Sequence, residues 1–314
     1  EYCIEECIAA WTATLEDVFP TKATSAQKVD FVPVAYKTKN VLVAKSKVAK
    51  PKVLIPVFPG SNCEWDMSRR FEAAGAEADI FVINNLTSDA LSASVAQMAK
   101  KIEQSQIIAI PGGFSAGDEP GGSGKFIAAI FKNPAISEAV MQLIQRREGL
   151  MTGICNGFQA LVKLGLVTHG EIRPMADDSP TLTYNDIGRH ISSLVLTKVV
   201  SNKSPWFSGV NVGDIHRVAA SHGQGRFVAD AGYIKQLFEN GQVPTVYVDD
   251  SGEIAMDAPH NPNGSMYGIE AITSPDGRVL GKMCHSERIG DGLYKNVLGD
   301  YDQKIFEAGV KYFG

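Results

Sequence analysis

Short apolar runs alternate along the chain with segments whose apolar residues recur at helical spacing. The runs suited to buried strands cover residues 52–58, 77–83, 106–113 and 149–155. The helical segments follow them at residues 63–76, 88–104, 123–147 (broken at Pro134) and 156–165. This alternation predicts an α/β fold, an open and mostly parallel sheet with helices on both faces. Because active sites in such sheets lie at the carboxyl ends of the strands, chemistry is expected in the loops after the third and fourth runs.

The second half of the chain has a different pattern. Its apolar runs are β-rich and cover residues 192–200, 214–220, 243–250 and 267–284. Ser274-Pro-Asp-Gly277 within the last run is a hairpin-turn signal. Residues 301–313 return to helical spacing.

The first 50 residues stand apart from this pattern. Residues 4–19 have the spacing of one amphipathic helix, and residues 20–50 are rich in Lys, Ala and Val without any glycine. We interpret residues 1–50 as a helix and linker, the tail of an upstream domain, and residues 51–314 as one domain. The alternative is that the helix belongs to the main domain.

Composition narrows the functional class. The 314 residues are 44% hydrophobic and 21% charged, with a net charge of −5, so the chain as a whole does not attract nucleic acid or acidic membranes. No apolar run approaches the roughly 18–20 residues of a membrane span. The five cysteines have no spacing typical of a disulfide framework, which favours a reducing, cytoplasmic setting.

A cysteine lies between two glycines where the fourth apolar run meets its helix. The stretch Gly153-Ile-Cys155-Asn-Gly157 has the spacing of a nucleophile elbow, a tight turn that lifts the central side chain out of the sheet. Such a turn crowds its neighbours, so glycine is needed two positions either side. The sulfur would lie at a helix N-terminus, which favours a thiolate. The alternative is a buried structural cysteine at a tight turn.

Two further motifs favour the nucleophile. Residues 110–118, IPGGFSAGD, end the third run in paired glycines whose backbone amides could help hold an oxyanion. Residues 281–288, GKMCHSER, place His285 and Glu287 two positions apart. A cysteine nucleophile needs a base, and the base needs a carboxylate that orients it. His-x-Glu alone is a weak signal, but the three motifs in this order predict a Cys–His–Glu triad.

On these motifs, residues 52–313 resemble a class I (triad) glutamine amidotransferase domain, whose signature is the Gly-x-Cys-x-Gly elbow with a later His-x-Glu. A narrower resemblance, to the C-terminal glutaminase domain of phosphoribosylformylglycinamidine synthase, rests on GGFSAGD, GICNGFQAL, SHGQGRF (221–227) and GKMCHSER. The resemblance implies a flavodoxin-like sheet. It also implies that residues 1–50 are the end of the synthase domain of a fused enzyme.

The resemblance assigns roles to residues at matching positions. Cys155 would be the nucleophile, His285 its base and Glu287 the carboxylate that orients the base. The backbone amides of Gly113 and Asn156 would form the oxyanion hole. The residues implied in substrate binding are Gly112, Phe114, Gln159 and His222.

The implied reaction is the hydrolysis of L-glutamine to glutamate and ammonia through a cysteinyl thioester. The ammonia would pass to the synthase domain of the same polypeptide or complex. That domain would use ATP and magnesium to make formylglycinamidine ribonucleotide in purine biosynthesis. No cofactor is expected in this chain, and neither nucleic acid nor membrane is expected as a partner.

Three positions depart from the family's usual motifs. Gln224 replaces an acidic residue, Ser286 replaces the proline between His and Glu, and Cys284 lies where proline is common. The triad is intact, but these changes raise the question of what holds its loop.

Two rival interpretations stay open. One is a cysteine hydrolase or deglycase of the DJ-1 type, a class that usually lacks a late His-x-Glu. The other is a non-catalytic amidotransferase-like domain kept for docking. Residues 117–125 resemble a phosphate-binding loop but lack the required glycine and Ser/Thr positions.

The other candidate residues carry weaker signals. Cys63, at a helix start that the pattern predicts, is interpreted as structural, and Asp177, Asp178 and Asp186 as solvated loop residues. No metal site is predicted, because His169, His190, His216 and His260 have no metal-ligand spacing.

Overall fold

The computed structural model describes residues 3–18, 30–117 and 124–314. Its central sheet contains β1 (Lys52–Val57), β2 (Glu77–Val82), β3 (Ile107–Ile110), β4 (Leu150–Ile154), β10 (Ala271–Thr273) and β11 (Val279–Lys282). The strand order is β10-β11-β4-β3-β1-β2, and all pairs are parallel except β10 with β11. The predicted open, mostly parallel sheet is confirmed.

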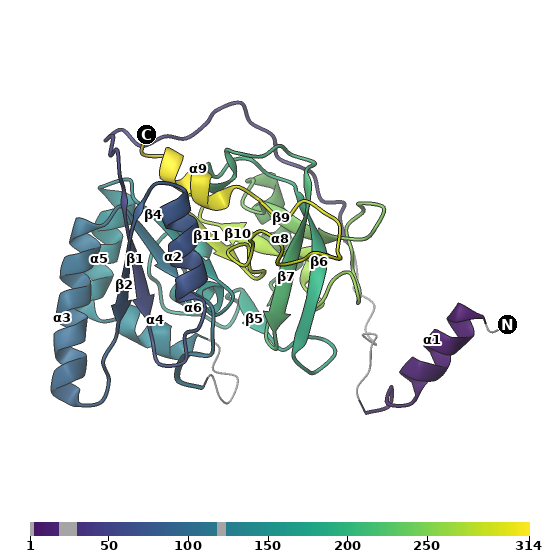
Figure 1. Ribbon diagram of the computed structural model, residues 1–314. Coiled ribbons are helices and arrows are strands. Elements are labelled where there is room, and N and C mark those ends of the chain that lie inside the picture. Colours follow the sequence, from purple (N-terminus) through teal and green to yellow (C-terminus); the bar gives the residue numbers. More distant parts are fainter. Residues whose placement is uncertain (1–2, 19–29, 118–123) are drawn as a thin grey trace.

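Helices cover both faces of this sheet (Figure 1). The helices α3 (Ser88–Gln104), α4 (Lys125–Phe131), α5 (Pro134–Gln145) and α6 (Asn156–Leu164) pack side by side on one face. The helices α2 (Glu64–Ala73) and α9 (Ile305–Lys311) pack together on the other. The predicted break at Pro134 separates α4 from α5, where Asn133 caps α5 by accepting a hydrogen bond from the Ala135 amide.

The hairpin of β10 and β11 joins the parallel sheet rather than the β-rich half. In the register of β11 with β4, Gly281 lies opposite Gly153 and Lys282 opposite Ile154. The segment that follows β11 therefore emerges beside the end of β4. This pairing places residues 283–287 next to Cys155, although they lie far apart in the sequence.

A second β layer flanks the sheet. An antiparallel sheet contains β6 (Ile191–Val199), β7 (Ile215–His222) and β9 (Thr245–Val248), and a smaller one contains β5 (Thr181–Thr183) and β8 (Arg226–Val228). The helix α8 (Ala231–Glu239) follows β8 in this half, whereas the short helix α7 (Leu166–His169) packs against α6 and the hairpin of β10 and β11. The β7 strand reaches the central site, because the His285 amide donates to the Ala219 carbonyl at 2.8 Å.

The N-terminal segment consists, where it is described, of a helix and a stretch without regular secondary structure. The helix α1 (Ile4–Ala13) is shorter than the predicted 4–19 and buries none of its residues. Residues 30–50 contain neither helix nor strand but run along the domain (Figure 1), held by backbone hydrogen bonds from Tyr36 to Val200 and from Ala44 to Tyr312. The predicted linker is thus tied to the domain rather than free of it.

Two remaining points from the sequence concern the stretch that resembles a phosphate-binding loop and the absence of a membrane span. Most of the loop-like stretch 117–125 lies outside the described residues. Within the described ranges, none of the helices is both long and apolar enough to span a bilayer.

Candidate active site

Cys155 occupies the turn between β4 and α6 with φ of 53°, in the left-handed region. A Cβ at Gly153 would lie 2.6 Å from the backbone of Gly157, and one at Gly157 would lie 2.3 Å from the carbonyl oxygen of Ile110. Both glycines are therefore required by close backbone packing, as the elbow spacing predicts. The turn leaves Cys155 6% exposed, with its thiol 3.7 Å from the Ser221 carbonyl oxygen.

The structure brings His285 and Glu287 to the same place. Nδ1 of His285 lies 2.6 Å from Oε1 of Glu287, and both side chains are 1% exposed. The point where a Cβ of Gly112 would lie is 2.8 Å from Cε1 of His285 and 3.3 Å from Cβ of Cys155. The imidazole and the Cys155 side chain thus both lie against Gly112, and the two groups interact. Nε2 of His285 has no hydrogen-bond partner among the described residues, and Nδ1 contacts Glu287, so Nε2 is the nitrogen available for proton transfer.

The surroundings of His285 favour its charged form. Burial alone would lower the pKa of His285, but the charge of Glu287 and the contact with Cys155 outweigh it. The pKa of His285 therefore lies well above its ordinary value of 6.5. A raised pKa favours the protonated ring, which can give its Nε2 proton to a leaving group.

We expect Gly112→Ala to lower kcat for glutamine hydrolysis by about 10²-fold. The added methyl group would collide with the His285 ring, and a misplacement of about 1 Å in a catalytic group can cost that much. Gly290→Ala is the matched control, since its Cβ position has nothing within 4 Å and its φ is not positive. Steady-state kinetics of both variants check this expectation, and equal rates for the two would contradict it.

The two predicted oxyanion amides lie in the loops that flank Cys155. Gly113 has φ of 141°, and a Cβ there would lie 2.5 Å from the Gly60 carbonyl oxygen, so this loop is pinned against the turn after β1. Asn156 begins α6 directly after the cysteine. Its side-chain oxygen accepts from the Ser115 amide at 3.1 Å, which ties the two loops together.

A cavity of about 280 Å³ opens onto Cys155. Its lining includes three residues predicted to bind substrate, namely Phe114, Gln159 and His222. Gly112, predicted with them, is not in the lining and packs against His285 instead. The sequence motifs did not indicate four other lining residues, Tyr184, Gly188, Arg189 and His190. They follow the short strand β5 and carry no recognisable motif.

The side chain of Gln159 connects Asn156 to the backbone of residue 224. This contact explains why the site can hold a glutamine at position 224 in place of the usual acidic residue. Its Oε1 accepts from Nδ2 of Asn156 at 2.8 Å, and its Nε2 donates to the backbone carbonyl of Gln224 at 2.6 Å. Because the contact uses the main chain of residue 224, it does not depend on an acidic side chain there.

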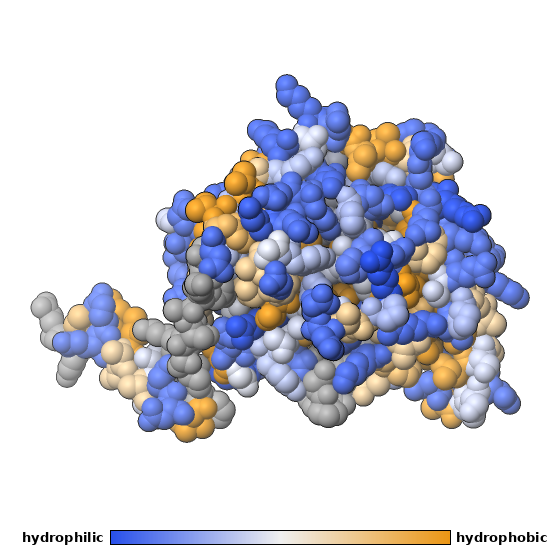
Figure 2. All heavy atoms as spheres, turned by 180° about the vertical axis from the view of Figure 1, so that it is seen from behind, coloured by the Kyte–Doolittle hydropathy of each residue, from blue (hydrophilic) through white to orange (hydrophobic). Residues whose placement is uncertain are grey.

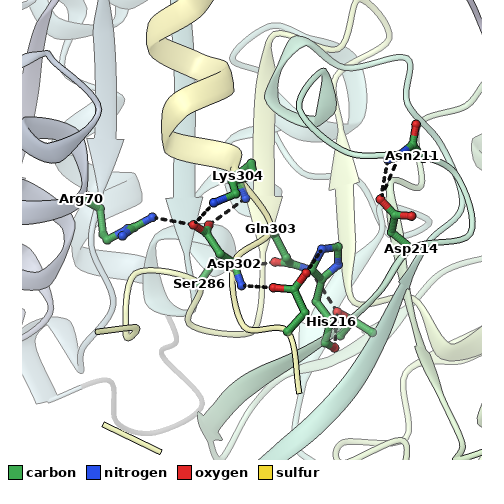
Figure 3. Close-up of polar contacts among 10 residues, drawn as sticks. Arg70, Asn211, Asp214, His216, Ser286, Asp302, Gln303 and Lys304 are labelled. Carbon is green, nitrogen blue, oxygen red and sulfur yellow. Dashed lines mark hydrogen bonds and ion pairs between the residues drawn. The ribbon is translucent and has the colours of Figure 1, made fainter. Parts of the chain in front are cut away.

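The loop that carries the triad is anchored by polar contacts in place of the family's proline (Figure 3). Ser286 donates to Oε1 of Gln303 at 2.6 Å, and Nε2 of Gln303 donates to Oγ1 of Thr197 at 3.0 Å. In the same view Arg70 of α2 points at Asp302, with 3.3 Å between Nη2 and Oδ2. The segment before α9 therefore joins the triad loop, β6 and α2.

A buried ion pair fixes the chain just before His285. Lys282 and Glu270 are both fully buried, with Nζ and Oε1 2.7 Å apart. The same carboxylate accepts from the Cys284 amide at 2.8 Å and from the Thr245 hydroxyl at 2.6 Å. The sequence patterns gave no indication of this pair.

His222 is a poor alternative to His285 as the base. Burial, with a smaller effect of His285, lowers the pKa of His222 to about 3. Its Nε2 lies 3.0 Å from Nδ2 of Asn263, which fits a neutral ring that accepts a hydrogen bond. A group with so low a pKa is a weak base at neutral pH, so His222 suits the pocket wall.

An elbow cysteine at the end of a parallel strand, a facing His–Glu pair and flanking glycine loops together define a class I glutamine amidotransferase. Comparison with known proteins gives the particular family. The model of the CobB/CobQ-like glutamine amidotransferase domain matches residues 50–313.

The relatives agree with this match. The phosphoribosylformylglycinamidine synthase subunit PurQ of Methanococcus maripaludis strain C7 is 35% identical over 242 residues, 76% of this chain and 82% of that protein. The probable phosphoribosylformylglycinamidine synthase of Arabidopsis thaliana is 32% identical over 264 residues, 83% of this chain but 18% of that protein. The structure of PurLQS from Thermotoga maritima contains a chain that matches with a TM-score of 0.61 and 26% identity, covering 84% of this chain and all of that one.

The chain belongs to the family of glutamine amidotransferases that includes the PurQ subunit of phosphoribosylformylglycinamidine synthase. The family resemblance predicted from the motifs is confirmed.

Proposed function

We propose that this chain hydrolyses L-glutamine to L-glutamate and ammonia, and that it is the glutaminase part of phosphoribosylformylglycinamidine synthase. The observation that carries the proposal is the convergence of Cys155, His285 and Glu287 at one cavity large enough for an amino acid. The PurQ relatives support the particular pathway, because their names specify this synthase.

The first half-reaction forms a thioester. With the thiol proton of Cys155 transferred to Nε2 of His285, the sulfur attacks the side-chain amide carbon of glutamine, and the oxyanion is held by the backbone N–H groups of Gly113 and Asn156. The carbon–nitrogen bond breaks as Nε2 of His285 gives its proton to the leaving nitrogen, and ammonia departs. Glu287 keeps the imidazole oriented throughout through Nδ1.

The second half-reaction returns the free enzyme. Nε2 of His285 takes a proton from water, and the resulting hydroxide attacks the thioester carbon. The carbon–sulfur bond breaks to release glutamate. In this arrangement the amide reaches Cys155 at the base of the cavity, while the α-amino and α-carboxylate groups lie toward Tyr184, Arg189 and His190.

The ammonia would be consumed by a synthase partner that uses ATP and magnesium to aminate formylglycinamide ribonucleotide. Residues 1–50 fit the proposal that this partner precedes the chain in one polypeptide, because a much longer relative contains the matching region. The helix α1 supports it further. Its Ile4, Ile8 and Trp11 are 71%, 57% and 85% exposed among the described residues. Figure 2 shows apolar atoms on the surface of this helix.

Titration with synthase tests the proposal. We expect the isolated chain to release glutamate slowly, and the rate to rise as synthase with its substrates bound is added. Trp11→Asp should weaken this response, while Ala13→Asp, on the opposite face of α1 at 100° per residue, should not. A chain that is fully active alone and indifferent to synthase would favour the free-standing hydrolase instead. A chain with no glutaminase activity under any condition would favour the docking interpretation.

A further inference from the structure

A second cysteine, Cys63, lies next to the imidazole of His285. Sγ of Cys63 is 3.8 Å from Nδ1 of His285, the same nitrogen that contacts Glu287. Cys63 is 1% exposed and lies between β1 and α2. One ligand atom from each of Cys63, His285 and Glu287 falls within 4.8 Å of the other two.

One carboxylate oxygen of this cluster, Oε2 of Glu287, is available to bind a cation. Oε2 of Glu287 is buried and has no hydrogen-bond partner within residues 3–18, 30–117 and 124–314, which is costly for a carboxylate oxygen unless something else satisfies it. A thiolate, an imidazole and a carboxylate are together the donor set that zinc prefers. Histidine spacing along the sequence could not indicate this set, because Cys63 follows β1 whereas the other two residues follow β11.

We propose that Cys63, His285 and Glu287 form an inhibitory site for Zn²⁺ or a cation of similar softness. The binding site itself rests on the geometry alone, and only its inhibitory effect rests on the proposed glutaminase function. Three protein ligands with water in the fourth position complete a tetrahedral site.

The distances fit such a site with small adjustments. Ordinary zinc bond lengths and tetrahedral angles place sulfur and nitrogen about 3.6 Å apart, and nitrogen and oxygen about 3.4 Å apart. The observed separation of 3.8 Å between Sγ and Nδ1 is close to the first value. The separation of 2.6 Å between Nδ1 and Oε1 is shorter because a proton lies between them, so the carboxylate must retreat or turn its free oxygen inward.

The ion can arrive without crossing the glutamine pocket. A separate cavity of about 740 Å³ is lined by Glu287 and Arg288, and none of its lining residues lines the pocket at Cys155. Nη2 of Arg288 donates to Sγ of Cys63 at 3.1 Å, so this guanidinium lies between the cavity and the sulfur. Rotation of this guanidinium into the cavity would clear the way for the cation.

Binding would stop catalysis by changing the histidine. The ion displaces the Nδ1 proton and the thiol proton, so its affinity falls as the pH is lowered. With a cation on Nδ1, Glu287 no longer stabilises an imidazolium and Nε2 becomes a poorer base. Mg²⁺ prefers six oxygen ligands, so the magnesium that the synthase reaction needs would not occupy the site.

Inhibition kinetics in buffered free Zn²⁺ test the proposal, with each variant compared to its own metal-free rate. Wild-type chain should lose kcat with little change in KM, because the glutamine pocket is untouched. Cys63→Ala and the volume-conserving Cys63→Ser should require at least about 10-fold more free Zn²⁺ for the same inhibition. Equal inhibition of the wild type and both variants, or an increase in KM alone, would overturn the proposal.

Binding of Co²⁺ gives a readout that needs no activity. The thiolate-to-cobalt absorption band should form in wild type and in Cys155→Ala but not in Cys63→Ala. A band that survives in Cys63→Ala and is lost in Cys155→Ala would place the ion on the other cysteine and contradict the proposed site. A Cys63-dependent band in a chain without glutaminase activity would leave the site standing and remove the proposed function.

Discussion

Cys155→Ser is expected to lower kcat for glutamine hydrolysis by at least ~10³-fold, as loss of the nucleophile does in other triad enzymes. The serine hydroxyl has a much higher pKa than an ordinary thiol, so almost no nucleophilic anion forms at neutral pH. The fold should survive, because the two side chains differ little in volume and the strained turn depends on Gly153 and Gly157. Steady-state release of glutamate and a thermal melt together measure the two effects.

Cys284→Ser is the matched control for this variant. Cys284 is fully buried, and its thiol donates to the Tyr247 hydroxyl at 3.6 Å and lies outside the glutamine pocket. We expect it to keep most of the activity. Loss of activity in Cys63→Ser or Cys284→Ser with retention in Cys155→Ser would refute the assignment of the nucleophile.

His285→Gln should reduce kcat nearly as much as loss of the cysteine, by about 10³-fold, because both proton transfers pass through this ring. Glu287→Gln should be less damaging, since the amide can still accept the Nδ1 hydrogen bond. It removes the charge that raises the pKa of His285, so this pKa should fall. The imidazolium is the acid of the first half-reaction. The alkaline limb of the pH–rate profile should therefore move to lower pH in Glu287→Gln.

His222→Gln tests the alternative in which His222, rather than His285, is the catalytic base. His222 lines the pocket but is held neutral, so its loss should affect KM more than kcat. If His222→Gln abolished kcat while His285→Gln kept it, the base would have to be reassigned. An unshifted pH profile in Glu287→Gln would contradict the proposed coupling between carboxylate and imidazole.

The local parts of the site could be predicted from the sequence because their causes are local. The glycines around Cys155 are needed by the turn itself, and the break at Pro134 follows from the proline ring. The alternation of strands and helices likewise determines a parallel sheet, apart from the order of its strands.

The parts of the site that could not be predicted depend on which segments, distant in the sequence, lie side by side in the fold. Nothing in residues 267–284 indicates that their hairpin pairs with β4, and this pairing is what carries His285 to Cys155. The same holds for Cys63, which meets the histidine only because β1 and β11 end at the same edge of the sheet. Residues 30–50 lack a periodic pattern because they bond to the domain through single backbone contacts and not as a helix or strand.

The most direct test of the central claim is to locate the covalent intermediate. The chain, with synthase present if turnover requires it, is mixed with isotopically labelled glutamine, quenched in acid during turnover and digested for mass spectrometry. The account predicts a labelled, hydroxylamine-sensitive glutamyl thioester on the peptide that contains Cys155, and none on that peptide from Cys155→Ser. Labelled glutamyl groups on Cys63, or rapid turnover with no cysteine adduct at all, would contradict it.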